Sequence, residues 1–487
     1  MIRVRRVVAT TATATSVLAG CLLVDPFPDV LPERTSTDAT SAPETSEATL
    51  SPPDGCVDAG DPSACGPCGR RCATGYACLD GRCANDVVEM AAGGEHTCAA
   101  VASGEVYCWG DPSSGQTGAR DAGDDLLARP IPLDALGTPV RAAALAAGAD
   151  HTCALRPDGS LRCWGSQVHG ALSNNRTSPD GGPSFEPIPQ VAFQFPGGAG
   201  RVPYTALAQG ALADHACSTD AKGRAFCWGA NDHGQLGPTS GGTLADCAGN
   251  TGGCRALPSE ISGVASVVQL AVGATHTCAL DAAGAVWCWG YNFLGGLGTG
   301  SRGLACGAPC AGEPPSRVKV GRAKIVATGS ETSCAVLEDE SVWCWGKNTS
   351  GVLGHASPDD ARGTRCCFST TACAAYCNPT PTKVDGVTGA VTVTLGAGHA
   401  CALLRDGTLR CWGANAFGQL GAGDDASSPA PRSVTGLSGA AGVVAGMRHT
   451  CAWTQTGEVW CWGAANAIGS DPTLGNALTP RRVARLP

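Results

Sequence analysis

The sequence predicts an all-β fold, a seven-bladed β-propeller of four-stranded blades, and three observations carry this prediction. The tripeptide Cys-Trp-Gly occurs seven times in the 487 residues, and another cysteine stands ten residues before the cysteine of every copy. Successive copies are 50 to 67 residues apart, so a fixed core alternates with connections of variable length, as in repeat folds with insertions in loops. Glycine (68) and proline (32) are frequent and only 15% of residues are charged, which favours short strands and turns over long helices.

Each repeat unit contains the pattern of four short strands. In HTCALDAAGAVWCWG (276–290) alternating residues, a glycine turn and renewed alternation predict a hairpin. A glycine-rich turn follows, such as NDHGQLG (231–237), and then a strand led by proline, such as PAPRSV (429–434). The fourth strand ends in glycine, as in GVVAGM (442–447). Four meandering strands make one propeller blade.

These motifs resemble the regulator of chromosome condensation repeat. The matching features are the GxxHTCAL-like start, the DG turn, the Cys-Trp-Gly and the NxxGQLG tail, which recur in register over about residues 87–487. Members of that family form seven-bladed propellers, so the resemblance implies one ring over residues 86–487. Some units depart from the pattern: Thr332 replaces the histidine of unit five, and DPSSGQTG and SQVHGALS replace the tail in units one and two.

The end of the array predicts how the ring closes. The first unit, DVVEMAAGGEHTC, lacks the proline-led strand that precedes every later unit. LTPRRVARL (478–486) matches such a strand and has no unit after it. We therefore expect this C-terminal strand to pair into the first blade and to remove the open edge of the ring.

The paired cysteines predict one disulfide in every hairpin. A turn near Gly159 places Cys153 opposite Cys163, at a Cα separation that a disulfide tolerates. Each bridge closes about eleven residues and contributes roughly 3 kcal/mol in the chain-entropy model. The alternatives are metal ligation, although thiols on separate blades cannot converge on one ion, and buried free thiols, which suit an oxidising compartment poorly. The predicted pairs are Cys98–Cys108, Cys153–Cys163, Cys217–Cys227, Cys278–Cys288, Cys334–Cys344, Cys401–Cys411 and Cys451–Cys461.

The cysteine count indicates an exported protein, because 29 cysteines are too many for a reducing cytosol. Fourteen lie in the hairpins, six in an N-terminal segment and eight in loops, and each of these groups is even. The remaining thiol is Cys21. The predicted loop disulfides are Cys247–Cys254, Cys306–Cys310 and two that join Cys366 and Cys367 with Cys373 and Cys377.

The N-terminus predicts an export signal and an anchor. Residues 1–20 have three arginines, an apolar run and small residues, and the sequence Leu-Ala-Gly-Cys ending at Cys21 resembles the lipobox of bacterial lipoproteins. The resemblance implies cleavage before Cys21, acylation of this residue (palmitate among the chains) and an outer-membrane lipoprotein of the bacterial envelope, periplasmic or surface-exposed. An ordinary secretory signal is the alternative.

Two segments separate this anchor from the ring. Residues 21–55 are rich in proline, serine, threonine and acid, which predicts a disordered tether. Residues 56–84 hold six cysteines and predict a small disulfide-bonded module, although Cys65 and Cys68 also have the spacing of zinc ligands. This segment resembles the cysteine-rich modules that precede propellers in bacterial surface proteins.

The loops between the Cys-Trp-Gly and the proline-led strand are the predicted binding surface. They follow the same strand in every unit, so they project from one face, and disulfides would hold them rigid. Protease-resistant decoration is the alternative interpretation. The candidate binding residues are Asp246, Asn250, Arg255, Arg302, Arg362, Arg365 and Tyr376.

The recurring histidines and tryptophans favour structural roles. Six of nine histidines occupy one repeat position, where capping of a strand end is favoured over a metal site, because equivalent positions on separate blades form a wide circle. The seven Cys-Trp-Gly tryptophans favour blade-to-blade packing over a sugar-binding platform. The acidic pairs at 124–125, 359–360 and 424–425 fit solvated turns better than acid–base dyads or calcium ligands. No hydrolase, phosphate-binding or dinucleotide motif occurs in a supporting context, so we expect no enzyme, cofactor or metal.

These observations favour a lipid-anchored binding or scaffold protein for a protein or an envelope polymer. The net charge of −9 and the lack of a basic stripe argue against nucleic acid, and we expect a monomer whose only membrane contact is its lipid. The resemblance extends to secreted propellers that inhibit β-lactamases, which makes an inhibitor of an exported enzyme the second hypothesis. Nucleotide exchange on a small GTPase, the activity of the family's founder, is a distant third because export separates the chain from such a partner, and a hydrolytic or lyase propeller is a more distant fourth.

Overall fold

A computed structural model describes residues 64–65, 70–71, 78–79, 82–118, 127–131, 134–174, 185–192, 203–238, 253–303, 312–356, 364–367, 373–470, 472–483 and 486. The expected signal peptide, Cys21 and the tether at 21–55 lie outside these residues, as does most of the 56–84 module. Of that module the structure describes two short hairpins, β1 (Ala64–Cys65) with β2 (Arg70–Arg71) and β3 (Cys78–Leu79) with β4 (Arg82–Cys83). Across the described residues, no helix has the length and hydropathy to cross a membrane.

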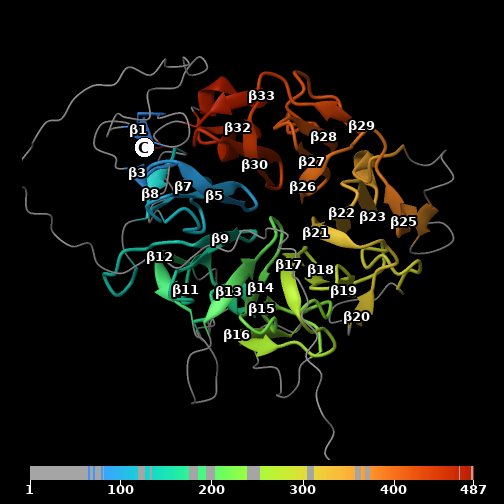
Figure 1. Ribbon diagram of the computed structural model, residues 1–487. Coiled ribbons are helices and arrows are strands. Elements are labelled where there is room, and N and C mark those ends of the chain that lie inside the picture. The colour runs from blue at the N-terminus through green and yellow to red at the C-terminus, as the bar shows by residue number, and fades with distance from the viewer. Residues whose placement is uncertain are drawn as a thin grey trace, which may run out of the picture. The chain divides into compact units, whose positions relative to one another are not determined.

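Seven antiparallel sheets, one for each repeat unit, form the propeller, which confirms the predicted fold class. In Figure 1 they follow one another around the ring in chain order. The blades are β5–β8 (Val87–Ala92, His96–Val101, Val106–Gly110, Arg129–Pro130), β9–β12 (Ala144–Ala147, His151–Leu155, Leu161–Ser166, Phe185–Val191), β13–β16 (Tyr204–Ala208, His215–Asp220, Ala225–Ala230, Cys254–Glu260), β17–β20 (Val267–Val272, His276–Asp281, Val286–Gly290, Glu313–Arg317), β21–β25 (Ala323–Thr328, Thr332–Leu337, Val342–Lys347, Thr364–Cys367, Cys373–Lys383), β26–β29 (Ala390–Leu395, His399–Leu404, Leu409–Gly413, Ser428–Ser433) and β30–β33 (Ala440–Ala445, His449–Thr454, Val459–Gly463, Ala477–Arg482). Short 3-10 turns are η1 (Val168–Gly170), η2 (Thr349–Gly351), η3 (Ala465–Ala467) and η4 (Pro472–Leu474).

The strands of a blade have fixed places relative to the axis of the ring. The first strand of each blade is innermost, the cysteine hairpin supplies the second and third strands, and the proline-led strand is outermost. In the fifth blade β24 pairs outside β25 as a fifth strand. The seven inner strands line a central cavity of about 240 Å³, and most of its lining is alanine, valine and leucine.

The expected ring closure is wrong. The C-terminal strand β33 pairs with β32 and completes the seventh blade, while the first blade has β8 as its own outer strand. Every blade is therefore one contiguous chain segment, and the proline-led strand belongs to the unit before it. Packing closes the ring instead, because Trp109 of the first blade shares a core with Trp462 and Ile468 of the seventh.

The hydrophobic core lies between the blades. In each hairpin the two cysteines are opposite one another, as Cys278 is to Cys288, and a disulfide joins all seven pairs across Cα–Cα distances of 4.1 Å. The sulfurs face the next blade, where they pack with its tryptophan, as Cys217 and Cys227 do with Trp289. The disulfides therefore stabilise both a hairpin and the core beside it.

The antiparallel topology gives the ring two different faces. One, here the insertion face, carries the connections between the first and second strands and the long connections between the third and fourth. The other, here the turn face, carries the hairpin turns and the links between blades. Of the predicted loop cysteines, Cys254 begins the outer strand β16 and Cys377 lies in β25 opposite Lys347, at the insertion-face end of the third strand.

Candidate functional site on the insertion face

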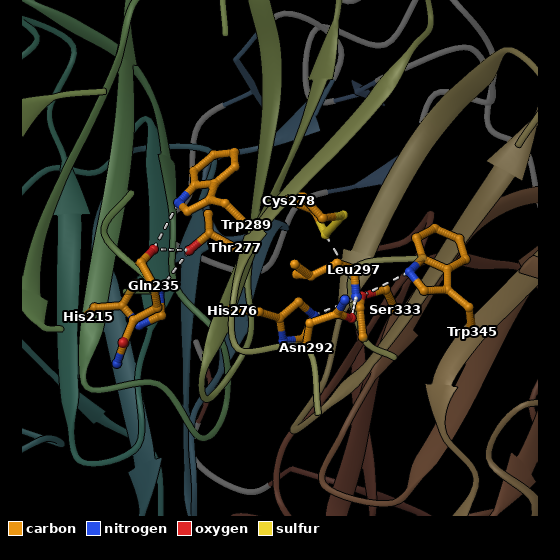
Figure 2. The surroundings of a disulfide bond; sticks show 12 residues. His215, Gln235, His276, Thr277, Cys278, Trp289, Asn292, Leu297, Ser333 and Trp345 are labelled. Atoms are coloured by element: carbon orange, nitrogen blue, oxygen red, sulfur yellow. Dashed lines mark hydrogen bonds between the residues drawn. A yellow bond between two sulfur atoms is a disulfide. The ribbon is translucent and has the colours of Figure 1, made fainter. Parts of the chain in front are cut away.

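A chain of hydrogen bonds joins neighbouring blades just beneath the insertion face (Figure 2). Between the third and fourth blades, His215 Nε2 lies 2.8 Å from Thr277 Oγ1, and this hydroxyl donates to the Gln235 carbonyl at 2.8 Å. The Trp289 indole N–H donates to the same carbonyl at 2.9 Å. Since the hydroxyl gives its only proton to the carbonyl, it accepts from the imidazole, which is therefore protonated at Nε2. We call this imidazole–hydroxyl–carbonyl–indole set the inter-blade latch.

The inter-blade latch is complete at four of the seven interfaces. In these four, the imidazole and the hydroxyl oxygen are 2.8–2.9 Å apart and the hydroxyl lies 2.8–3.1 Å from the carbonyl oxygen. Their members are His96, Thr152, Gln116 and Trp164; His215, Thr277, Gln235 and Trp289; His276, Ser333, Gly296 and Trp345; and His399, Thr450, Gln419 and Trp462.

The histidines of the repeat position are buried and neutral. Loss of hydration lowers the pKa of His96, His215 and His449 from 6.5 to about 3, and that of His151, His276 and His399 to about 4. A neighbouring histidine adds to the fall for His96, His215 and His449. Among the described residues, no group of three or more His, Cys, Asp and Glu could hold a metal ion. Five of these histidines form a hydrogen bond with a hydroxyl group of the neighbouring blade, instead of capping the end of their own strand as expected.

The NxxGQLG tail positions the carbonyl of the latch. Asn415 Oδ1 accepts from the Leu420 N–H at 2.8 Å and folds the turn back, and Gln419 Oε1 accepts from the Phe417 N–H at 3.0 Å. Leu420 is fully buried beneath the turn. Asn231, Asn292 and Asn348 make the same bond to the leucine five residues on. The turns that carry the insertion loops are therefore anchored to the interface between blades.

Fourteen residues, most of them polar, form a ring on the insertion face, outside the inner strands that line the cavity. Each blade contributes two residues. One directly precedes the repeat histidine (or Thr332, its replacement in the fifth blade), and the other directly follows the Cys-Trp-Gly. The backbone N–H of the second residue donates to the carbonyl of the first at 2.8–3.0 Å. We call these residues the mouth ring: Glu95, Asp150, Asp214, Thr275, Glu331, Gly398 and Arg448 with Asp111, Ser166, Ala230, Tyr291, Lys347, Ala414 and Ala464.

Negative charge gathers on one part of the mouth ring. Glu95 pairs with Arg448, and Glu331 pairs with Lys347 at 3.1 Å, which neutralises the ring on the side of blades five and seven. Asp111, Asp150 and Asp214, here the acidic sector, have no lysine or arginine partner within ion-pair distance among the described residues.

Burial and, to a smaller extent, repulsion between carboxylates raise the pKa of two groups of the acidic sector. Burial raises the pKa of Asp150, and the Asp111 carboxylate adds to the rise. Burial also raises the pKa of Asp214, an effect that His169 at 3.7 Å opposes and that Asp150 and Asp232 reinforce. A cationic group placed over the acidic sector would relieve this repulsion.

Aromatic residues border the rest of the mouth ring. The rings of His233 and Tyr291 meet edge to face with centroids 4.8 Å apart, and burial raises the pKa of Tyr291. Across the ring, the Arg448 guanidinium lies 4.7 Å from the centre of the Phe417 ring. Sequence reasoning missed the mouth ring, although the acids directly before His96, His151 and His215 and after the first Cys-Trp-Gly were a visible signal.

The predicted binding residues do not form one cluster. Arg255 is only 9% exposed on β16 and contacts the Gly237 carbonyl at 3.5 Å, so it is buried rather than presented. Arg302 is exposed and Tyr376 is half-buried on the insertion side of the fourth and fifth blades. Asp246, Asn250 and Arg362 lie outside the described residues, and for Arg365 only the strand position is described.

The predicted loop disulfides are described only in part. Cys254 and Cys377 are each disulfide-bonded and buried, as is Cys83 of the N-terminal module. Cys78 of the same module is also disulfide-bonded. Cys247, Cys306 and Cys310 lie outside the described residues, and Cys366, Cys367 and Cys373 are described only by their strands.

Models of known protein families match most of the chain. Residues 70–367 match the model described as the RCC1-like domain. The regulator of chromosome condensation (RCC1) repeat is matched by residues 339–403, 390–419 and 406–453. The first of these matches alone covers more than half of the chain.

Two relatives illustrate the similarity. The ultraviolet-B receptor UVR8 of Arabidopsis thaliana is 30% identical over 271 residues, which are 55% of this chain and 54% of the receptor. The human E3 ubiquitin-protein ligase HERC2 is 28% identical over 340 residues, 68% of this chain but 6% of the ligase. The chain thus spans about half the length of the receptor and a small part of the ligase.

Solved structures share the fold. Prp20p of Saccharomyces cerevisiae has a TM-score of 0.59 at 23% identity, with 74% of this chain and 80% of that chain covered. Human WBSCR16 also has a TM-score of 0.59, at 18% identity, with 78% of this chain and 94% of that chain covered.

Proposed function

Because the chain belongs to the RCC1-like domain family, we propose that it is a protein-binding propeller whose insertion face contacts the partner. The observation that carries the proposal is the acidic sector of Asp111, Asp150 and Asp214. It stands on turns that the inter-blade latches anchor, so its charges are held in place before binding. The partner therefore presents lysine or arginine side chains to this sector.

The family relationship supports a binding role in a general way. The yeast relative Prp20p has binding properties toward Gsp1p and histones. For this chain we propose binding rather than catalysis, since the mouth ring offers paired ions and repelling carboxylates, and the cavity is lined mainly by aliphatic side chains.

We further propose that the propeller is held at a bacterial cell envelope. The support for this is the cysteine content, the three arginines before an apolar run and the lipobox-like sequence that ends at Cys21. Acylated Cys21 would hold the ring at the membrane through residues 22–55. Mass spectrometry of the protein purified from membranes tests this part by itself: a diacylated or triacylated Cys21 at the N-terminus supports it, and an unmodified Cys21 contradicts it.

The experiment for binding is capture of partners from envelope extracts by the full chain. The test variant is D150K/D214K, which reverses the charge of two carboxylates that are only partly buried: Asp150 is exposed and the Asp214 side chain is 46% exposed. The matched control is E338K/E458K, which reverses two exposed carboxylates on the turn face, 54% and 40% exposed. We expect the control to capture the same partner as the unmodified chain and the test variant to lose it.

The outcomes also separate the alternatives. Equal capture by both variants contradicts the acidic sector as the contact surface. Binding followed by loss of activity of a captured hydrolase identifies the chain as an inhibitor of an exported enzyme. Faster nucleotide release from a captured GTPase identifies an exchange activity. Inhibition of a hydrolase and faster nucleotide release are both compatible with the insertion face as the contact surface.

A further inference from the structure

Two of the three incomplete inter-blade latches leave a buried polar group without a partner. His151 faces the third blade and Trp109 faces the seventh, and each is 1% exposed. Among the described residues, His151 Nε2 and Trp109 Nε1 have no hydrogen-bond partner, whereas Nε2 is bonded in the other five repeat histidines and only their Nδ1 atoms are unpaired. Such groups are costly in a folded protein, so each needs a physical explanation.

At the interface between the second and third blades, one hydroxyl is missing. Ala216 stands where Thr152, Thr277 and Thr450 supply the hydroxyl in complete latches. The other members are present: the Trp228 indole donates to the Ala171 carbonyl at 3.0 Å. His151 lies in the same place as the histidine of a complete latch. A Cβ on Gly148 would lie 2.2 Å from His151 Cε1, the same distance as from a Cβ on Gly93 to His96 Cε1.

At the interface between the fifth and sixth blades, the latch has neither its histidine nor its hydroxyl residue. There Ala400 replaces the hydroxyl residue and Thr332 replaces the histidine. Thr332 donates to the Lys347 carbonyl of its own blade at 2.9 Å, and the Trp412 indole still donates to the Val352 carbonyl at 2.8 Å. Since both the imidazole and the hydroxyl are replaced, neither the Thr332 hydroxyl nor the Trp412 indole is left without a hydrogen-bond partner.

We propose that a buried water molecule completes the latch between the second and third blades. Ala216 lacks the hydroxyl and the methyl group that threonine has at this position in complete latches, where the hydroxyl lies between the imidazole and the carbonyl. In complete latches the hydroxyl lies within 2.8–3.1 Å of both equivalent groups, so a water there has two partners at hydrogen-bond distance. Water both donates and accepts, so it suits either tautomer of His151, which a cation would not.

A second buried water completes the interface of the seventh and first blades. The seventh turn is shorter: Gly469 follows Gly463 by six positions, whereas Gly237 follows Gly229 by eight. His449 bonds Thr97 at 2.8 Å as usual, but Trp109 lacks the carbonyl that the other six indoles have. A water here accepts from the indole and from the Thr97 hydroxyl.

The first test is a crystal structure of the unmodified protein at a resolution that shows other buried waters. We expect one ordered water 2.7–3.2 Å from His151 Nε2, a second at this distance from Trp109 Nε1, and none between Ala400 and Thr332. Dry sites beside His151 and Trp109 would overturn the proposal, and so would a peak whose anomalous signal identifies an ion.

The second test compares A216T with A400T. In A216T the new hydroxyl replaces the water and donates to Ala171, and we expect the thermal midpoint to rise by about 1–3 °C. In A400T the hydroxyl faces Thr332 instead of an imidazole, and we expect no rise. Equal shifts in the two variants would contradict a polar site specific to His151.

Discussion

At the scale of single residues, the glycine three positions before a latch histidine decides whether its ring fits. A Cβ on Gly396 would lie 2.3 Å from His399 Cε1 and 2.3 Å from the Gly446 carbonyl oxygen. Five histidines have a glycine at this position, and in the third blade a longer connection takes its place. The glycine is thus needed for space at the latch.

Two substitutions in one connection have different expected outcomes. G396A forces the new methyl group into the His399 ring and lowers the free energy of unfolding by about 1–3 kcal/mol, as overpacking does. G398A meets only the Ala414 Cβ at 3.4 Å, at a position where other blades carry Glu95 or Arg448, and stays within about 0.5 kcal/mol. Denaturant unfolding of both variants checks the prediction, which equal losses would refute.

Residue types in the latch were only partly predictable. The histidine repeat was visible, but its partner was not, because the bond joins residues some fifty positions apart through the geometry of the ring. A weak signal existed: the unit that follows Thr332 has Ala400 where most units have a hydroxyl residue.

At the scale of elements, the hairpins and their disulfides followed from the sequence. The invariant spacing of ten residues determines the register, and Cys278 is opposite Cys288 as the turn at Gly284 requires. The outer strand was different. A proline-led strand between two hairpins can pair with either one, and the repeat pattern does not say which.

The disulfide of the fourth blade should contribute strongly to stability. The double variant C278A/C288A removes a bridge over about eleven residues and also sulfur atoms that pack against Trp345. We expect the free energy of unfolding to fall by about 3 kcal/mol or more. Chemical denaturation without reductant measures the loss; a change below about 1 kcal/mol would contradict a stabilising role.

The outer strand of the seventh blade can be tested by deletion of residues 478–487. The deletion removes most of β33, exposes the edge of β32 and uncovers the core shared with Trp109, to which Val483 belongs. We expect a lower thermal midpoint and a greater tendency to aggregate, because an open edge pairs with other chains. An unchanged midpoint together with an unchanged monomer fraction in light scattering would show that β33 is dispensable.

At the scale of the whole molecule, the ring contains six buried neutral histidines that act together. The unfolded chain binds a proton at each below pH 6.5, whereas the folded chain does so only near pH 3 to 4. Each histidine therefore stabilises the fold above pH 6.5, and this contribution is lost as the pH falls through the window from 6.5 to about 3.

We accordingly predict a steep loss of stability in mild acid, of up to about 1.4 kcal/mol per pH unit for each histidine. Glu89 acts in the opposite direction, since burial raises its pKa to about 7, and the raised pKa values of Asp150 and Asp214 act in the same direction as Glu89, but the six histidines outnumber these three carboxyl groups. Denaturation midpoints between pH 7.5 and 5 measure the slope, and H399N should make it shallower. A flat profile across this range would contradict the buried neutral histidines.

The contiguous blades have a consequence for how the chain can be rearranged. Asp86, directly before the first strand, lies against Gly457 in the last hairpin turn, and Val483, directly after the last strand, packs in the core that the first and seventh blades share. A circular permutant that joins these ends and opens the chain between any two blades would keep every sheet intact. Such a ring could also gain or lose a unit by duplication or deletion of one uninterrupted stretch of gene, without dividing a blade.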